Sequence, residues 1–426
     1  PQADQNVVKR ILSHVLAQHG VFYLRKNSER QHWRFVPSET TSLFSFAVLK
    51  AIDLEEEQVK RFSKELDSLV CEPFDLIQGP LVHAVFVDKG PGESGMLVLS
   101  FSHTVVDAIS LWILSNELEQ VWTQRSDTAE IHSPVLDQSG LDWNCYLHAH
   151  AQSRVAGQQT HYWMDIKKKI NGSLVDLQPR GNRKENSLRA VSRPHQHPGR
   201  LNPFLSLALS DRFASLREQH DVFLTAFLRA WYQASGNALC AVSLESHGRQ
   251  QMGQWGISGM PVGWFTMHFP VVFELDPSDS IWSSCDKITT AINNVPEGGS
   301  GFGLLRYLCC DPEIQTLFSK FPAPLIRFVY RGKMDQRFRD RDAFKILDAS
   351  VQRPYKAGPS SSDSNEILVF VRHEVGGFSW NIESTPGTRT DWKMPPEEQL
   401  VSLMEQALND GLRPFDKMSA KVAEPR

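Results

Sequence analysis

The segment SHTVVDAIS (Ser102–Ser110) places a histidine and an aspartate four residues apart, directly after an apolar stretch. Histidine accepts a proton near neutral pH, so His103 could act as a general base. The spacing of His103 and Asp107 is weak evidence by itself, because short motifs arise by chance, and a purely structural histidine stays open. His161 and Asp165 repeat the spacing, and there an i,i+4 salt link within a helix is the simpler interpretation.

The elements expected around His103 would suit a catalytic group. Met96–Phe101 (MLVLSF) is almost continuously apolar, which predicts a strand covered on both faces. The stretch from Asp107 to Trp122 predicts a helix. A rigid strand would position the imidazole, and the turn before the helix would expose it.

Strand and helix patterns alternate along the rest of the chain, which indicates an α/β (α+β) protein. In the first half, the patterns predict a helix over Val7–Gln18 and strands over Val21–Leu24 and Leu81–Val87. In the second half, they predict a strand over Leu205–Leu209 with Ser210 capping a short helix. A helix over Val222–Ala234 and a strand over Ala241–Leu244 are predicted to follow.

A basic, proline-rich segment from Gln178 to Pro203 separates the chain into two halves. It holds six Lys and Arg residues against one acid, and four prolines. We therefore expect an N-terminal lobe over residues 1–177, a connection over 178–203 and a C-terminal lobe over 204–426. Lys356–Glu366 predicts a polar loop, and the tail from Arg413 predicts a frayed end or linker.

Composition and charge exclude several classes of protein. The 426 residues are 41% hydrophobic and 22% charged, which argues against a disordered chain or a disulfide scaffold. A formal charge of -4 gives no basic field for nucleic acid. No apolar run predicts a signal peptide or a membrane span, and the six scattered cysteines fit reduced thiols, so a cytoplasmic location is expected.

Other catalytic and metal-binding patterns are missing from the sequence. It contains no G-x-S-x-G, Walker, H-E-x-x-H or G-x-G-x-x-G pattern. His195 and His197 could bind a metal, but no carboxylate or cysteine lies near them in the sequence. We therefore expect no metal site.

Read together, several blocks of the sequence resemble the condensation-domain superfamily of nonribosomal peptide synthetases. QHGVFYLR resembles the family's R-H-E-x-L-R, PFDLIQGPL matches P-F-D-L-x-x-G-P-L, and SHTVVDAIS stands where the family has H-H-x-x-x-D-G. Farther on, LESHGR, VGWFTMHFP, VPEGGSGFGLLRY and FVYRG resemble blocks of the epimerization branch. In order and spacing the blocks span nearly the whole chain.

Departures from the family pattern favour one branch. Ser102 replaces the first histidine and Ala108 the glycine, giving S-H-x-x-x-D-x-x-S, a form that resembles fungal terminal condensation-like domains, which release peptides by cyclization. Val329 replaces the asparagine of the epimerases' F-N-Y-L-G block. The family's first strand and its S-x-A-Q-x-R motif are not visible before Val7, so part of the first lobe is expected to be missing.

The resemblance implies two chloramphenicol-acetyltransferase-like lobes in a V-shaped pseudo-dimer, with His103 in a tunnel between them. The substrate would be a peptidyl thioester on the phosphopantetheine arm of a thiolation (peptidyl carrier) domain within a large synthetase of several modules. The domain itself would bind no cofactor. The leading hypothesis is intramolecular amide formation with release of a cyclic peptide. The alternatives are Cα epimerization by His103 and Glu245, and a non-catalytic scaffold that binds carrier proteins.

The resemblance also implies roles for individual residues. His103 would be the catalytic base, with one ring nitrogen free and the other donating to a nearby carbonyl. Asp107 would pair with Arg249 as structural support, and Glu245 would be a second acid/base or an orienting group. Further residues are expected to line the tunnel, namely Ser102, Ser110, Trp264, Phe265 and Tyr330.

Overall fold

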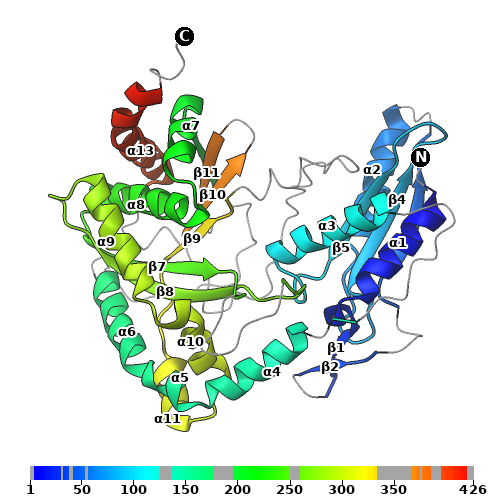
Figure 1. Cartoon of the computed structure of the whole chain (residues 1–426), viewed down its shortest axis with the longest axis horizontal. Coiled ribbons are helices and arrows are strands. Elements are labelled where there is room, and N and C mark those ends of the chain that lie inside the picture. The colour runs from blue at the N-terminus through cyan, green and yellow to red at the C-terminus, as the bar shows by residue number, and fades with distance from the viewer. Residues whose placement is uncertain are drawn as a thin grey trace. The chain divides into compact units, whose positions relative to one another are not determined.

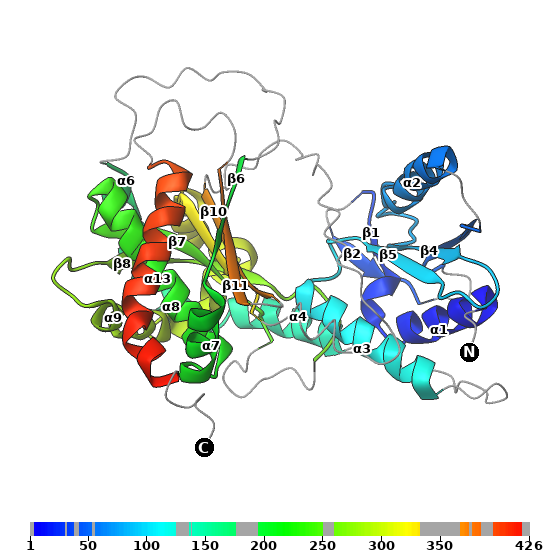
Figure 2. The same cartoon turned by 90° about the horizontal axis from the view of Figure 1, so that it is seen from above.

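The computed structural model describes residues 4–29, 32–37, 42–52, 56–124, 136–137, 139–175, 195–249, 260–332, 367–374, 377–384 and 395–419. The chain forms two compact units (Figures 1 and 2). Of the described residues, the first unit holds those up to Leu147 and those of the segment Arg249–Thr266, and the second unit holds the rest.

This division differs from the lobes expected at residues 1–177 and 204–426. Helix α6 (Thr160–Val175) belongs to the second unit because it buries Trp163, Ile166 and Ile170 in that unit's core. Conversely, Arg249–Thr266 belongs to the first unit although it follows a strand of the second. The expected connection over 178–203 lies outside the described residues as far as residue 194.

The first unit has helices on both faces of a short sheet. Strands β3 (Ser45–Lys50), β4 (Val82–Asp88) and β5 (Met96–Phe101) pair in that order, with β3 parallel and β5 antiparallel to β4. Successive β4 residues point to opposite faces. Ala84 and Phe86 pack on α1 (Gln5–Ala17) and α3 (Ala108–Gln124), whereas Val85 packs on α2 (Glu56–Val70). The predicted strands and helices in these regions are confirmed.

The strand predicted over Val21–Leu24 is wrong for most of its length. Residues Gly20–Tyr23 form a 3-10 turn, η1, and the two-stranded ribbon of β1 (Leu24–Lys26) and β2 (Trp33–Phe35) begins only afterwards. The N–H of Phe22 donates to the carbonyl of His19, which tightens the chain, while the Phe22 side chain is fully buried. The residues are therefore apolar because they reach the core, not because they pair in a sheet.

A six-stranded sheet forms the centre of the second unit. The strands, in order across the sheet, are β6 (His195–Arg200), β11 (Gly377–Ser384), β10 (Ile367–Glu374), β9 (Ile326–Tyr330), β7 (Leu239–Ser246) and β8 (Met267–Glu274). The three central strands β10, β9 and β7 are parallel to one another, and the other neighbours are antiparallel. The strand predicted over Ala241–Leu244 is confirmed as part of β7.

Two long helices pack on one face of this sheet (Figure 1). α8 (Leu216–Ser235) contains the helix predicted over Val222–Ala234, which is therefore confirmed. The helix begins at a capping box formed by Ser215 and Glu218. α13 (Glu397–Ser419) packs against α8 through a buried stripe of Leu400, Met404, Leu408 and Leu412. The tail from Arg413 is expected to be frayed, but its residues 413–419 continue this helix, and the rest of the tail lies outside the described residues.

The strand predicted over Leu205–Leu209 is also wrong. These residues lie in α7 (Pro203–Arg212), whose N-cap is Asn202 rather than Ser210. Leu205, Ala208 and Leu209 are buried and Phe204 and Leu207 are exposed, which is a helical and not a strand periodicity. The apolar run is too short for its composition to distinguish the two.

The segment around His195 and His197, expected to be an exposed connection, is strand β6 and pairs with β11. The Nδ1 atom of His197 lies 3.6 Å from Oε1 of Glu398. Within the described ranges, no cluster of His, Cys, Asp and Glu has the makings of a metal site. The polar loop predicted at Lys356–Glu366 lies outside the described residues.

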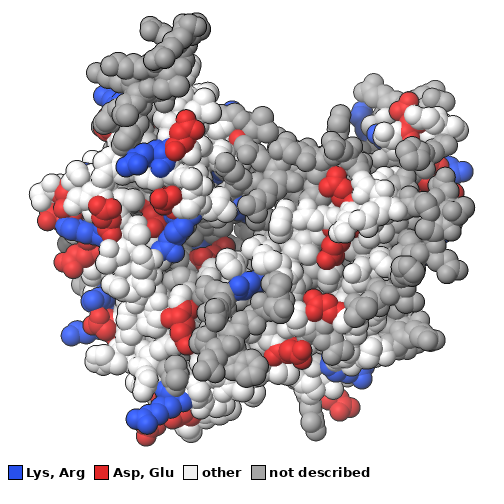
Figure 3. All heavy atoms as spheres, viewed as in Figure 1, with Lys and Arg blue, Asp and Glu red and all other residues white. Residues whose placement is uncertain are grey.

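The remaining helices, in chain order, are α4 (Ser139–Ala151), α5 (Arg154–Gln158), α9 (Ile281–Asn293), η2 (Pro296–Gly299), α10 (Ser300–Gly303), η3 (Leu304–Leu308) and α11 (Pro312–Ser319). No helix among those described combines the length and the apolar character needed to cross a bilayer. On the face drawn in Figure 3, acidic and basic side chains are interspersed over the second unit, and its described residues form no continuous basic patch there.

Candidate active site

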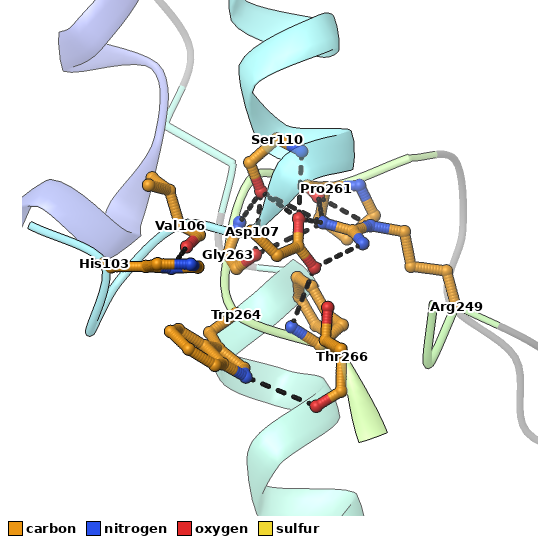
Figure 4. Close-up of polar contacts among 10 residues, drawn as sticks. His103, Val106, Asp107, Ser110, Arg249, Pro261, Gly263, Trp264 and Thr266 are labelled. Carbon is orange, nitrogen blue, oxygen red and sulfur yellow. Dashed lines mark hydrogen bonds and ion pairs between the residues drawn. The ribbon is translucent and has the colours of Figure 1, made fainter. Parts of the chain in front are cut away.

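His103 lies in the turn between β5 and α3, as the sequence predicts. Two backbone hydrogen bonds shape the turn: the N–H of Ser102 donates to Leu81 over 2.9 Å, and the N–H of Val105 donates back to Ser102 over 3.1 Å. The His103 side chain is exposed, and its Nδ1 lies 2.8 Å from the carbonyl oxygen of Val106 (Figure 4). A carbonyl can only accept, so Nδ1 carries the hydrogen and Nε2 keeps its lone pair in the neutral ring.

The indole of Trp264 lies against this imidazole. The two ring centroids are 4.4 Å apart and the planes are tilted by 38°. The indole N–H donates to the carbonyl of Thr266 over 3.2 Å, and 43% of the side chain is exposed (Figure 4). The segment 260–266 therefore contributes an aromatic wall to the site around His103.

Asp107 and Arg249, 142 residues apart in sequence, form a buried bidentate ion pair. Arg249 Nη1 lies 2.7 Å from Asp107 Oδ2, and Nη2 lies 2.9 Å from Oδ1. The carboxylate also accepts the backbone N–H of Ser110 at the start of α3 and that of Phe265. The contact predicted between Asp107 and Arg249 is present, and it joins the first turn of α3 to the segment 260–266.

The ionisation of Asp107 follows from these contacts. Burial alone would raise the pKa of this carboxyl group, but the hydrogen bonds and positive charge of Arg249 outweigh burial, and the N–H groups of Ser110 and Phe265 add to them. The pKa of Asp107 is therefore held below its ordinary value. The guanidinium is itself enclosed, because it also donates to the carbonyls of Pro261 and Gly263 and lies over the ring of Phe265.

Ser110 is placed differently from the expectation that it lines a tunnel. Its side chain is fully buried, and its hydroxyl contacts Asp107, Arg249 and Gly263. Ser102 is also buried, with its hydroxyl 2.7 Å from that of Thr104. Both serines therefore support the turn and the helix start from within the first unit.

Two other candidates, Glu245 and Tyr330, belong to the second unit. Glu245 lies near the end of β7 and is 28% exposed, and Tyr330, on β9, donates its hydroxyl to Gln219 over 2.6 Å. Burial raises the pKa of the Tyr330 phenol, so it stays protonated and acts as a donor. That Glu245 faces His103 and that Tyr330, Trp264 and Phe265 line a tunnel remain predictions.

His268, which no sequence pattern indicates, is the neighbour of Glu245 across β7 and β8. Burial, assisted by the charge of Arg327, lowers the pKa of His268 to about 4. Its Nδ1 is 3.6 Å from Glu245 Oε1, but the imidazole is neutral at pH 7, so the contact is not an ion pair there. Only the strand register identifies this neighbour, because the residues are 23 positions apart.

We expect this histidine to make stability depend on pH. The folded pKa lies below the unfolded value of about 6.5, so between about pH 6.5 and pH 4 the unfolded state binds the proton and the folded state does not. Stability is therefore full above pH 6.5 and is lost as the pH falls. Because the side chain is 35% exposed, screening should limit the loss to about 1 to 2 kcal/mol.

Urea unfolding of His268→Asn across this range should show a smaller loss than the wild-type protein. His161→Asn, at an exposed position on α6, is the matched control and should keep the wild-type slope. Equal slopes for the wild-type protein and His268→Asn would contradict the assignment.

The site also contains positions that sequence patterns do not reveal. Val106 supplies the carbonyl that orients His103, and Pro261 and Gly263 supply carbonyls to Arg249. These contacts use backbone atoms, so residue type gives little sign of them. The one signal in the sequence is the glycine of VGWFT: a Cβ at Gly263 would lie 2.5 Å from the Phe265 ring.

The chain belongs to the condensation-domain family, whose model matches residues 1–361. Over 375 residues it is 27% identical to one of the linear gramicidin synthase proteins of Brevibacillus parabrevis, in a match that covers 88% of this chain and 5% of that protein. Over 426 residues it is 24% identical to bacitracin synthase 3 of Bacillus licheniformis, and that match covers 99% of this chain and 6% of that protein. The chain thus spans about a twentieth of the length of these relatives.

Membership of this family has direct consequences for the chemistry of the site. Condensation domains are amide-forming acyltransferases that work within synthetases of several modules. They bind no cofactor themselves, because the phosphopantetheine arm belongs to the carrier protein.

Solved structures show the same two-lobed fold, which confirms the predicted fold class. The epimerization domain from the third module of tyrocidine synthetase B matches with a TM-score of 0.72 and 18% identity, over 98% of this chain and 90% of that one. A condensation domain that mediates chain release from the enacyloxin polyketide synthase matches with a TM-score of 0.63 and 17% identity. This match covers 100% of this chain and 78% of that one.

Proposed function

We propose that this chain is a terminal condensation-type domain that forms an amide bond within a carrier-bound peptidyl thioester and releases a cyclic peptide. One observation carries the proposal. The His103 imidazole is exposed, its Nδ1–H is fixed by the Val106 carbonyl, and its Nε2 is left as a proton acceptor. This is the state that a base for an attacking amine requires.

The proposed reaction uses this lone pair. An amine of the tethered peptide attacks the carbonyl carbon of its own thioester, forming the C–N bond. His103 Nε2 takes the proton from the nitrogen, the C–S bond breaks, and the pantetheine sulfur leaves as a thiolate. The proton then passes from His103 to that thiolate, so the imidazole ends neutral. Because both reacting groups belong to one bound molecule, alignment alone can contribute about 7 to 11 kcal/mol.

One observation favours release by cyclization, and a second is compatible with it. The motif from Ser102 to Ser110 has the S-H-x-x-x-D-x-x-S form that resembles fungal terminal domains, although the two relatives named above are bacterial. A domain of the same fold is described as mediating chain release from a polyketide synthase, so the fold is compatible with such a role.

Cα epimerization is the second candidate, favoured by Glu245 within the block LESHGR. Its carboxylate is partly exposed beside a neutral His268. In this reaction one group removes the α-proton of the tethered residue and another returns a proton to the opposite face. His103 and Glu245 are the proposed pair, and no peptide would be released.

Incubation with a synthetic peptidyl thioester loaded on a carrier domain, in D₂O, distinguishes these functions by mass spectrometry. A free peptide lighter than the hydrolysed acid by one water means cyclization. Deuterium at Cα of peptide that stays on the carrier means epimerization. Neither change, with carrier binding intact, means a scaffold and overturns both enzymatic proposals.

Glu245→Gln separates the two enzymatic functions further. A cyclizing domain should still release its ring at a rate within about tenfold of the wild-type protein, since Glu245 takes no proton in that mechanism. An epimerase should lose Cα exchange by about 10²- to 10⁴-fold. Glu274→Gln, at an exposed position on β8, is the matched control and should change neither product. A Glu245→Gln protein that loses ring release to the same extent would contradict the cyclization mechanism.

A further inference from the structure

Trp264 is held from both sides by the same helix turn that follows His103. On one side, the backbone of Gly263 contacts the Ser110 hydroxyl through both its polar groups: the Gly263 N–H donates to Oγ over 2.9 Å, and the Gly263 carbonyl lies 2.7 Å from Oγ. On the other side, the N–H of Phe265 donates to Asp107 over 3.1 Å. Ser110 and Asp107 lie within four residues at the start of α3 (Figure 4).

This double attachment leaves little freedom to the residue between the two fixed neighbours. The indole N–H bonded to Thr266 fixes the rotation of the Trp264 ring, and the ring meets the imidazole at 4.4 Å. Ser110 is fully buried and has no access to a substrate. Its hydroxyl bonds the backbone of Gly263, so Ser110 can influence His103 through the segment that carries Trp264, and its bond to Asp107 also ties it to the helix start.

An aromatic face at this distance favours the protonated state of a histidine. The quadrupole of an indole attracts a cation within about 6 Å of its centroid, and tryptophan is the strongest of the aromatic side chains in this respect.

We propose that Trp264 is a positioning residue that holds the His103 ring and stabilises its protonated form. Ser110 in turn keeps Trp264 in place through its hydrogen bonds to the Gly263 backbone. The proposal deepens the function given above and rests on it in one respect, since a stabilised imidazolium matters only if His103 takes a proton in the reaction. The proposal assigns a function to Ser110, the last serine of S-H-x-x-x-D-x-x-S. The ion pair between Asp107 and Arg249 does not by itself explain why a serine stands there.

Other charges near His103 stay the same when Trp264 or Ser110 is changed. Residues 260–266 bear no charged side chain, and on α3 Asp107 is neutralised by Arg249. The helices of this region also carry charged or titratable side chains, none of which is changed in these variants: Lys9, Arg10 and His14 on α1, Glu117 and Glu119 on α3, and Asp142, His148 and His150 on α4. Comparing variants at constant ionic strength therefore isolates the contribution of the indole.

The test is the pKa of His103, measured by NMR on the free domain with ¹³C-labelled histidine and assigned by the signal lost in His103→Asn. Trp264→Leu should lower the pKa by about half a unit, the equivalent of one exposed cation–π contact. Trp264→Phe retains an aromatic face and should restore at least part of the shift. Ser110→Ala should lower the pKa in the same direction, and the double variant Ser110→Ala/Trp264→Leu should lower it no further than Trp264→Leu alone.

Each outcome decides one part of the proposal. An unchanged or raised pKa in Trp264→Leu overturns stabilisation by the indole. A folded Ser110→Ala protein in which His103 has the wild-type pKa, or additive shifts in the double variant, overturns the proposal that Ser110 holds Trp264 in place. If Ser110→Ala does not fold, Trp264→Leu and Trp264→Phe still test the contact. No substrate is present, so failure of the proposed function, which is measured by product formation, is distinguished from failure of this inference.

Discussion

His103→Ala should lower turnover of a carrier-bound peptidyl thioester by about 10²- to 10⁴-fold, the range for a side chain that transfers a proton in the transition state. The effect is expected on the rate of the chemical step, because the substrate is delivered by its carrier and not by this side chain. Product formation in single-turnover reactions, followed by mass spectrometry, measures that step.

The fold should survive this substitution, because the His103 side chain is exposed and its hydrogen bond goes to the carbonyl of Val106, three residues along the same turn. His103→Asn is the sharper variant: its amide can donate to that carbonyl as Nδ1–H does, but it cannot accept a proton. His161→Ala, at an exposed position of α6, is the matched control. A folded His103→Ala protein with wild-type turnover would refute the role of base, and a loss below about tenfold would leave positioning of the substrate as the dominant effect.

The local frame of the site could be predicted from the sequence. The apolar run MLVLSF and the polar turn after it define β5, His103 and the start of α3, because burial and periodicity are local properties. Local patterns failed where a short apolar run fits more than one structure. Leu205–Leu209 is helix α7, and Val21 lies in a 3-10 turn.

Pairing across long sequence distances could not be derived from local patterns. The contact between Asp107 and Arg249 was expected only because of the family resemblance, and the neighbours Glu245 and His268 emerge only from the register of β7 and β8. Ser110 is the clearest case. A serine in the first turn of a helix looks like a surface residue, yet here it is fully buried against Gly263, because a segment from distant sequence folds over it.

The buried ion pair should make Asp107→Ala one of the most destabilising substitutions in the first unit. The Arg249 guanidinium would keep its carbonyl partners but lose its counter-charge in a site where neither side chain is more than 3% exposed. Breaking one half of such a pair costs about 3 to 5 kcal/mol, and the start of α3 would also lose the carboxylate that accepts the Ser110 N–H. Urea unfolding and calorimetry measure the loss, and a change below about 1 kcal/mol would contradict the argument.

The pH dependence and a double variant separate charge from packing in the same pair. The pKa of Asp107 is lowered in the folded state, so its contribution is complete above the unfolded value of about 3.9 and is lost as the pH falls below it toward the folded pKa. Asp107→Asn should remove that acid dependence. The double variant Asp107→Ala/Arg249→Met, which leaves no unpaired charge, should be less unstable than the sum of the single variants, because each single change strands one buried charge. Additive losses would mean that the two residues stabilise the unit independently, and that the pair does not hold the segment 260–266 to the helix that follows His103.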